Sequence, residues 1–391
     1  MNPRIYLLAI AAFVAGVDEN LVGGILPLLA HELDVSLSAV GQLTTVFSLT
    51  FALCAALLLV MTARVERRTL LFAALMIFAV GNLGSGLAVN YWMLLVFRVI
   101  SAASCALVVV LASITAAMLA STEQRGRAIG IVFMGISSSL VLGIPVGIAL
   151  GETFHWRMPF LLLALLALAI GLLLRGVLPR FPRRSPITLA DYCSQLRNPT
   201  IMLGQLVTVL LLAGHFVLFA YLAPYTQQTL GISGVPLSYL YCFFGLASIC
   251  GGYCGGWLSD RVGSKCALLV VPALFTLVMA TLPFGRNSLI TFLPLYALWM
   301  GLSWTISPAV QNYLLQAAPA AGEANLGINT SAMHLGVALG AAIGGIVIAE
   351  GNLLLTPLVG ALVSALALVA ACLCLFLARE PMELSTPRGN L

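Results

Sequence analysis

Apolar blocks of about twenty residues recur along the whole chain. Such a block crosses the ~30 Å hydrocarbon core of a bilayer as an α-helix. Only 8% of the 391 residues are charged, against roughly 25% in a soluble domain. A β-barrel would instead show alternating segments of about ten residues. The sequence therefore predicts an all-α membrane protein with twelve spans, at residues 5–30, 37–63, 69–89, 91–119, 128–150, 158–178, 200–224, 237–258, 267–284, 289–316, 325–349 and 353–378.

Basic residues fall almost entirely on one side of this predicted topology. If the N-terminus is cytoplasmic, fifteen Lys and Arg residues lie at inner ends and loops, and only Arg157 and Arg286 lie outside. This asymmetry follows the positive-inside rule, so we expect both termini in the cytoplasm. The apolar run after Arg4 is longer than the core of a signal peptide, so we expect it to be the first span. The net charge of +5 then sets topology and does not indicate nucleic-acid binding.

The predicted spans fall into two related halves. A shift of 197 residues superposes a proline, an Arg-Val dipeptide and three glycines of the first half on identical residues of the second half. The matching residues are Pro27 with Pro224, Arg64-Val65 with Arg261-Val262, and Gly130, Gly143 and Gly147 with Gly327, Gly340 and Gly344. We expect six-helix bundles at residues 1–178 and 200–378, a linker loop at 179–199 and a cytoplasmic tail at 379–391. Transporters built this way bind their substrate between the halves, near the bilayer midplane.

Two acidic residues, Asp18 and Glu19, interrupt the first apolar block. A charge at the bilayer centre costs roughly 2.5–3.5 kcal/mol on insertion scales, so it is tolerated where it is paired, hydrated or protonated. At 1.5 Å per helical residue, Arg98 and His215 lie at about the depth of Glu19. The shift of 197 also places Asp18 on His215. We expect Arg98 to pair with a buried acid rather than to snorkel outward.

These four residues, Asp18, Glu19, Arg98 and His215, form the candidate proton-coupling group. A histidine in a span can also simply hydrogen-bond a neighbouring helix. Because consecutive helical positions differ by about 100°, only one of the two acids can point squarely into a given cavity. Glu19 shares its helix face with Ala12, Ala15, Gly16 and Gly23, whereas Asp18 shares a bulkier face.

In the loop after the eighth predicted span, an acidic and a basic residue stand next to each other between two glycines. The loop reads Gly256-Trp257-Leu258-Ser259-Asp260-Arg261-Val262-Gly263-Ser264-Lys265. This resembles the G-x-x-x-D-R-x-G-x-[RK] signature of the major facilitator superfamily. The resemblance implies twelve helices in two pseudo-symmetric six-helix bundles, and a gating motif at Gly256, Asp260, Arg261, Gly263 and Lys265. In the first half, Ala63–Arg68 has lost both the Asp and the Gly, so we expect gating to depend more on the second half.

The fifth predicted span contains Gly143-Ile144-Pro145-Val146-Gly147, then Gly151. Glycines four residues apart let helices approach closely, and proline bends the span. The segment resembles the antiporter motif of proton-coupled drug exporters, with Gly143, Pro145 and Gly147 as its residues here. Arg98 matches the intramembrane arginine of the same superfamily, and related exporters carry an acid at the position of Glu19. The resemblance thus ranks Glu19 first as proton carrier and implies a bacterial inner-membrane protein.

The subgroup that the chain resembles most is the bacterial purine base and nucleoside efflux pumps, although sugar and drug exporters share parts of the pattern. The shared segments are Glu19-x-x-Val22-Gly23-Gly24-Ile25-Leu26-Pro27, Gly41-Gln42-Leu43, Ala213-Gly214-His215, Pro308-Ala309-x-Gln311 and Asn329-Thr330-Ser331-Ala332. Polar and aromatic residues of the spans would suit a ring-bearing solute, although each can equally join helices. These candidate substrate-binding residues are Gln42, Ser137, Tyr221, Tyr225, Trp304, Gln311, Asn312, Asn329 and His334.

The sequence therefore predicts a monomeric, proton-coupled efflux transporter for a small purine-like solute, powered by the proton gradient without a cofactor. A broad multidrug exporter conferring drug resistance, a sugar exporter and a proton-coupled importer use the same parts and are the alternatives. No nucleophile–base arrangement or phosphate-binding loop indicates an enzyme. Cys250 and Cys254 share a helix face, but no His or acid joins them at metal-ligand spacing, so we expect no metal site.

Overall fold

The structure, a computed structural model, describes all residues except 1, 63, 122–123, 182–193, 319–320 and 379–391. The side chains of residues 56, 59, 125, 126, 256, 260 and 323 also lie outside this description. Every element in the described part of the chain is helical. Twelve of its helices or helix groups are long and apolar enough to cross a membrane. The predicted all-α fold with twelve spans is confirmed.

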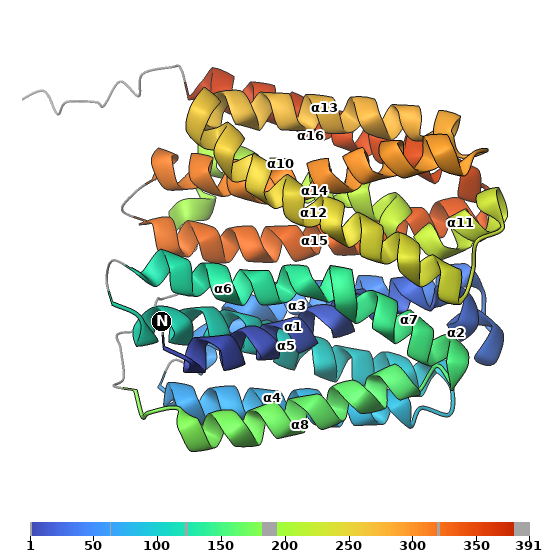
Figure 1. Ribbon diagram of the computed structural model, residues 1–391. Helices are drawn as coiled ribbons and strands as arrows, with labels where there is room; N and C mark the ends of the chain where they lie inside the picture. The colour runs from blue at the N-terminus through green and yellow to red at the C-terminus, as the bar shows by residue number, and fades with distance from the viewer. Residues whose placement is uncertain (1, 63, 122–123, 182–193, 319–320, 379–391) are drawn as a thin grey trace, which may run out of the picture.

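The helices lie side by side along one common direction (Figure 1). Those of the first half are α1 (Arg4–Gly24), α2 (Leu26–Glu32), α3 (Leu37–Met61), α4 (Arg67–Gly86), α5 (Tyr91–Leu119), α6 (Arg125–Ser138), the π-helix η2 (Ser139–Gly143), α7 (Ile144–Thr153) and α8 (Met158–Val177). Those of the second half are α10 (Pro199–Phe219), α11 (Leu222–Leu230), α12 (Val235–Val262), α13 (Ser264–Gly285), α14 (Leu289–Ala317), α15 (Gly322–Ala349), the 3₁₀ turn η4 (Leu353–Leu355) and α16 (Thr356–Leu377).

Three predicted spans are interrupted at a proline. The span predicted at 5–30 consists of α1 and α2, which meet at Ile25 just before Pro27. The span predicted at 200–224 consists of α10 and α11, which meet shortly before Pro224. In the fifth span, the π-helix η2 directly precedes the segment with Pro145. Proline has no N–H to donate to the preceding turn, so the regular helix ends or changes its hydrogen-bonding pattern at these places.

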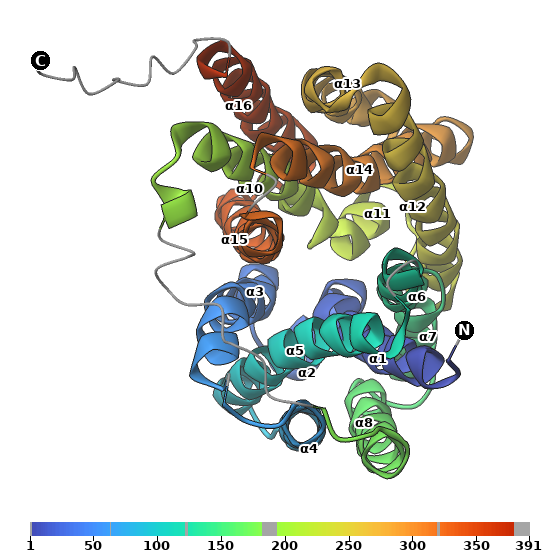
Figure 2. The ribbon, with the colours of Figure 1, turned by 90° about the vertical axis from the view of Figure 1, so that its left-hand side faces the viewer.

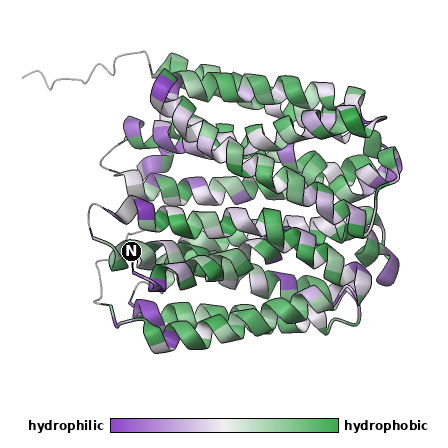
Figure 3. Ribbon diagram, in the orientation of Figure 1, coloured by the Kyte–Doolittle hydropathy of each residue, from purple (hydrophilic) through white to green (hydrophobic). Residues whose placement is uncertain are grey.

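The two faces of the molecule can be named by the chain ends. The terminal face is the one where α1 begins and α16 ends, and the distal face is the opposite one, where α1 ends. Hydrophilic residues gather toward these two faces, and apolar residues cover the helices between them (Figure 3). Many large apolar side chains there are exposed, among them Leu53, Phe284 and Leu362. Such a surface suits contact with lipid.

Viewed from the terminal face, the helices of each half group together (Figure 2). The halves contact each other through α3 with α15, and through α12 with η2 and α7. A side chain at Gly245 of α12 would meet the backbone of Val141 in η2 at 2.8 Å. The halves therefore touch backbone to backbone at the π-helical turn, which leaves no room for a larger residue at Gly245.

Glycines four residues apart hold equivalent helix pairs together in the two halves. A Cβ at Gly143 or Gly147 would overlap side chains of α1. A Cβ at Gly340 or Gly344 would overlap the backbone of α10. Since the two pairs are related by the same shift of 197 residues (340 − 143 and 344 − 147), the internal repeat seen in the sequence recurs in the packing. Gly143 and Gly147, which the sequence predicted as part of an antiporter motif, thus form a close contact between α1 and η2–α7.

Candidate functional site

The first acid of α1, Asp18, is paired with Arg98 inside the first half. Nη1 of Arg98 donates to Oδ1 of Asp18 at 2.6 Å, and both side chains are completely buried. The guanidinium also lies over the ring of Phe47, with 4.1 Å from Cζ to the centroid. Asn82 and Ser101 lie beside the same carboxylate. The expectation that Arg98 pairs with a buried acid is confirmed, and that acid is Asp18.

The second acid, Glu19, points elsewhere and reaches the other half of the molecule. Its Oε1 lies 3.3 Å from Nδ1 of His334 on α15, and the two side chains keep 16% and 11% of their surface exposed. The His334 ring stacks on Phe51 of α3, with 3.5 Å between centroids. Glu19 and His334 therefore contact each other across the two halves, through side chains that are not fully buried, and the contact is an ion pair when the histidine is protonated.

His215 does not join this charged group. Its ring lies among aromatic rings of the second half, 5.0 Å from Phe219 and 4.7 Å from Trp299. Among the described residues, no carboxylate oxygen lies within 4.0 Å of its ring nitrogens. Of the four candidate proton-coupling residues, the structure thus brings Asp18 and Arg98 together, gives Glu19 a different partner and leaves His215 apart.

Several candidate substrate-binding residues join helices to one another. The Asn329 amide donates to Gln205 and Thr208 of α10, both at 2.9 Å, and accepts from Gln311 of α14 at 3.4 Å. Asn312 donates to Ser259 of α12 at 2.8 Å. Because their hydrogen bonds are made within the second half, Asn329 and Asn312 act here as links between helices.

Tyr221 and Gln42 lie where the halves meet near the distal face. The Tyr221 hydroxyl donates to the carbonyl of Ala341 at 2.9 Å, and its ring occupies the space that a side chain at Gly41 would need. Ser38 donates to the carbonyl of Gly345 at 2.8 Å, with the Gln42 amide close by. These contacts, which we call the distal contact (Ser38, Gly41, Gln42, Tyr221, Gly345), close the boundary between the halves on that side.

The other three candidates occupy different places. Tyr225 is buried, 6.1 Å from the ring of Tyr296. Trp304 and Ser137 are half-buried, on α14 and α6. The structure therefore does not gather the nine candidates into one site.

The predicted gating motif lies at the terminal end of α12. The side chains of Gly256 and Asp260 are outside the described residues. The Arg261 guanidinium lies 5.1 Å from the Trp257 ring. Gly263, between α12 and α13, adopts φ +84°, a conformation that favours glycine. Lys265 is exposed. Next to the motif, Ser264 donates to Gln316 of α14 at 2.6 Å.

Several residues around these groups carry no recognisable signal in the sequence. Phe47, Phe51 and Asn82 are ordinary residues of apolar spans, and Trp299 and Tyr241 near His215 are equally inconspicuous. Only their contacts in the structure single them out. Among the described residues, no three His, Cys, Asp or Glu side chains are placed to hold a metal ion.

Comparison with known families identifies the fold. Residues 8–326 match the model of the Major Facilitator Superfamily. The chain belongs to this superfamily. The match runs from α1, with its two acids, through the first half and through the second half as far as the beginning of α15.

Curated bacterial relatives match almost the entire length of this superfamily member. An uncharacterized MFS-type transporter YbcL of Bacillus subtilis (strain 168) is 33% identical over 370 residues, covering 95% of each chain. The inner membrane transport protein YdhP of Escherichia coli (strain K12) is 30% identical over 373 residues, covering 94% of this chain and 95% of its own. A probable sugar efflux transporter of Helicobacter pylori (strain ATCC 700392 / 26695) is 27% identical, covering 93% of each.

Among solved structures, a bacterial homolog of the human lysosomal transporter Spinster has a similar fold. Its inward-facing and occupied structure aligns with a TM-score of 0.73 at 17% identity, over 95% of this chain and 96% of that one. At this identity the likeness concerns the fold alone. The chain is accordingly a multi-pass membrane transporter, and its relatives and fold are those of transporters.

Proposed function

We propose that this superfamily member is a proton-driven exporter of a small organic solute, with Glu19 as the residue that carries the proton. The observation that supports this most is the contact of Glu19 with His334 across the two halves, at 3.3 Å. Alternating access requires the halves to move relative to each other. A residue whose charge changes its attraction to the other half can couple its protonation to that movement.

The contrast with Asp18 supports the choice of Glu19. Asp18 and Arg98 are both completely buried and contact each other directly, so their charges offset one another within one half. Glu19 keeps 16% of its side chain exposed, so water or cargo can reach it. The less buried acid is therefore the better proton carrier, and the fully buried pair is the better fixed element of the helix packing.

The proposed transport cycle follows from the reciprocal effect of proton binding and cargo binding on each other. When the site opens outward, Glu19 takes up a proton and the cargo leaves; when it opens inward, the proton leaves and new cargo binds. Proton and cargo must then weaken each other's binding by the same factor. One proton that enters across 100 mV supplies about 2.3 kcal/mol, enough for a modest gradient of a neutral solute.

The terminal face would lie in the cytoplasm, as the distribution of arginines predicts, and the transporter would work as a monomer in an inner membrane.

The cargo that we propose is a purine base or nucleoside-like solute. The second candidate is a sugar, because a relative at 27% identity is named a probable sugar efflux transporter. A broad multidrug exporter is a third possibility that the same parts would serve. The antiporter motif resemblance at Gly143, Pro145 and Gly147 favours export over import.

Proteoliposomes with an imposed pH gradient test the proposal. Radiolabelled purines, nucleosides, sugars and common antibiotics would be screened for transport against the proton flux. Glu19→Gln should abolish gradient-driven transport while the protein remains folded, because glutamine cannot release a proton. Glu32→Gln is the matched control, at an acid near the distal face whose oxygens lie 3.8 Å from ring nitrogens of His31 and His155. Undiminished transport by Glu19→Gln contradicts the proposed role.

A further inference from the structure

Four aromatic residues from three helices pack in a chain of ring contacts within the second half. We call them the His215 cluster: His215 and Phe219 on α10, Tyr241 on α12 and Trp299 on α14. The rings of His215 and Phe219 stack at 5.0 Å and 22°. Trp299 lies 4.7 Å from His215, and Tyr241 lies 6.1 Å from Phe219. All four side chains are at most 5% exposed.

Three polar atoms of this cluster have no hydrogen-bond partner among the described residues. They are Nδ1 of His215, the hydroxyl of Tyr241 and Nε1 of Trp299. A buried donor or acceptor left unpaired costs roughly 1–3 kcal/mol. Phenylalanine at these positions would pack without that cost, so aromatic packing alone does not account for the residue types. Three unpaired polar atoms among stacked rings are what a binding site for a polar ring requires.

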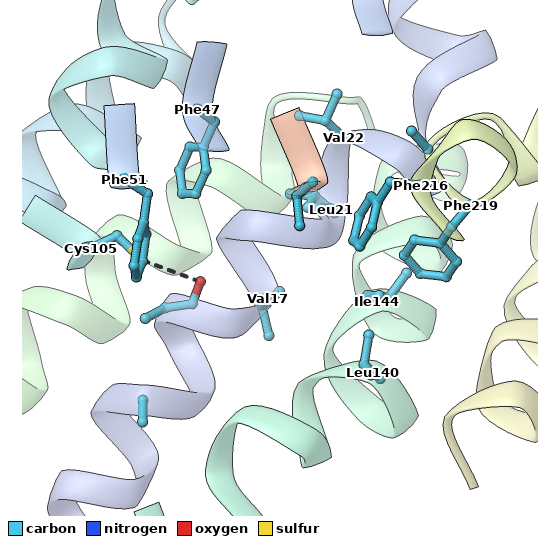
Figure 4. Packing of buried hydrophobic residues seen from close by; sticks show 14 of the residues in the cluster. Val17, Leu21, Val22, Phe47, Phe51, Cys105, Leu140, Ile144, Phe216 and Phe219 are labelled. Atoms are coloured by element: carbon cyan, nitrogen blue, oxygen red, sulfur yellow. Dashed lines mark hydrogen bonds between the residues drawn. The ribbon is translucent and has the colours of Figure 1, made fainter. Parts of the chain in front are cut away.

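The cluster borders the boundary between the two halves. Figure 4 shows Phe216 and Phe219 at the end of α10 turned toward Leu21 of α1 and Ile144 of α7. The carbonyl of Phe219 lies 3.8 Å from the position that a Cβ at Gly23 would take. Movement of the halves apart would therefore uncover the Phe219 side of the cluster first.

The internal repeat relates the His215 cluster to the ion pair of the first half. His215 corresponds to Asp18 (215 − 18 = 197). In the first half, Asp18 is paired with Arg98. In the second half, the histidine is left with an unpaired nitrogen among aromatic rings. Equivalent positions thus hold an ion-paired acid in one half and an unpaired polar ring in the other.

We propose that the His215 cluster is the site that recognises the cargo's ring, and that it takes a neutral, planar nitrogen heterocycle. This inference rests on the exporter function proposed above and specifies its cargo. Trp299 Nε1–H and the Tyr241 hydroxyl donate hydrogen bonds to ring nitrogens or carbonyl oxygens of the heterocycle, and Nδ1 of His215 supplies a third polar contact. Phe219 and His215 stack on the ring face. Since the cluster contains no carboxylate, ammonium or guanidinium group, it would not compensate the charge of an ionised cargo.

Binding by the purified transporter tests this proposal without a proton gradient. The probe is hypoxanthine, measured by equilibrium dialysis in detergent, with arabinose as the sugar comparison. Trp299→Phe and Tyr241→Phe keep a ring but remove one donor each, so we expect each to weaken hypoxanthine binding about tenfold, the effect of one lost hydrogen bond to a ligand. Because the Tyr241 hydroxyl has no partner among the described residues, Tyr241→Phe should unfold at or above the wild-type temperature. Trp299→Phe also removes buried ring volume, so we expect it to unfold at a lower temperature but to remain folded at the temperature of the assay.

Tyr313→Phe is the matched control. Tyr313 is also buried on α14, but its hydroxyl is bonded to Cys374 at 3.3 Å. This variant should lose thermal stability and bind hypoxanthine as the wild type does. Purine analogues with one ring nitrogen replaced by CH add a second measurement. For one of them the penalty of Trp299→Phe should vanish, because the acceptor of that hydrogen bond is already absent.

The outcomes separate this inference from the proposed function. If the wild type binds and exports hypoxanthine but both phenylalanine variants bind it equally well, the cluster is not the recognition site, whereas the exporter function stands. If arabinose binds with the same dependence on Trp299 and Tyr241, the heterocycle class is wrong. If the wild type exports no solute under a pH gradient, the proposed function itself fails, whatever the variants bind.

Discussion

Oε1 of Glu19 lies 3.3 Å from Nδ1 of His334, although one residue belongs to α1 of the first half and the other to α15 of the second. The neighbouring acid, Asp18, lies beside Arg98, Asn82 and Ser101 of its own half. The rotation of about 100° between adjacent residues of α1 thus gives one acid a contact that any movement of the halves must change, and the other a contact that such a movement can leave intact.

His334→Gln should uncouple transport from the proton gradient. Glutamine keeps a hydrogen-bonding group at this position but cannot become charged, so the charge–charge attraction between Glu19 and α15 is lost and protonation of Glu19 changes the contact much less. We expect gradient-driven transport to fall about tenfold, within the usual range of coupling energies, while exchange of labelled for unlabelled cargo at equal pH continues. Both rates would be measured in proteoliposomes. His31→Gln, at an exposed histidine, should leave both rates as they are.

Asp18→Asn should destabilise the protein far more than Glu19→Gln does. Removal of one partner from a fully buried ion pair leaves an uncompensated charge and costs about 3–5 kcal/mol. The double variant Asp18→Leu with Arg98→Leu removes both charges and should recover a large part of that loss. Thermal unfolding in detergent measures all three. Equal unfolding temperatures for wild type and Asp18→Asn would show that the pair does not stabilise the packing.

Gly41→Ala should open the distal contact. The added methyl group would overlap the Tyr221 ring, which is held in place by its hydrogen bond to Ala341. We expect a larger distance between the halves at the distal face, measured between spin labels at His31 on α2 and Gln228 on α11. Adding Tyr221→Leu should restore the wild-type distance, because leucine frees the space. A wild-type distance in Gly41→Ala alone argues against a closed contact there.

Glu66 should make the stability of α4 depend on pH. Its carboxylate caps the helix by accepting from the backbone N–H of Arg68 at 3.0 Å and of Thr69 at 2.9 Å, and also from that of Phe181 at 3.1 Å. Burial acts to raise the pKa of Glu66, but these hydrogen bonds outweigh it and bring the pKa below the ordinary value of 4.5. The carboxylate therefore stabilises the folded protein above pH 4.5, and this stabilisation disappears as the pH falls through the lowered pKa.

Glu66→Ala measures this contribution. At neutral pH it should cost about 1 kcal/mol, the typical loss for a helix cap, and the difference from the wild type should shrink as the pH is lowered through the acidic range. Unfolding temperatures at a series of pH values would record it. Glu350→Gln, at the exposed end of α15, provides the comparison. A difference that stays constant with pH would mean that the charge of Glu66 is not what stabilises the cap.

The sequence determined the parts of this protein that depend on solvation and chain length. Twelve apolar blocks fixed the number of spans, because a bilayer accepts only segments whose backbone groups are all satisfied. The positions of Pro27 and Pro224 at the same shift predicted two related halves, and both prolines mark a break between helices in the structure. The depth of Arg98 also predicted a buried acidic partner, because an unpaired charge at that level is costly.

The tertiary structure alone decided which partner each residue meets. Asp18 and Glu19 lie at nearly the same depth, so only the rotation of α1 against α5 and α15 assigns Arg98 to the first and His334 to the second. In the same way, packing turned Asn312, Asn329 and Tyr221 into links between helices. It also surrounded His215 with aromatic rings from three helices. These pairings join residues as many as 315 positions apart (334 − 19), and the rotation of a helix about its axis is set by contacts with its neighbours, which local sequence does not encode.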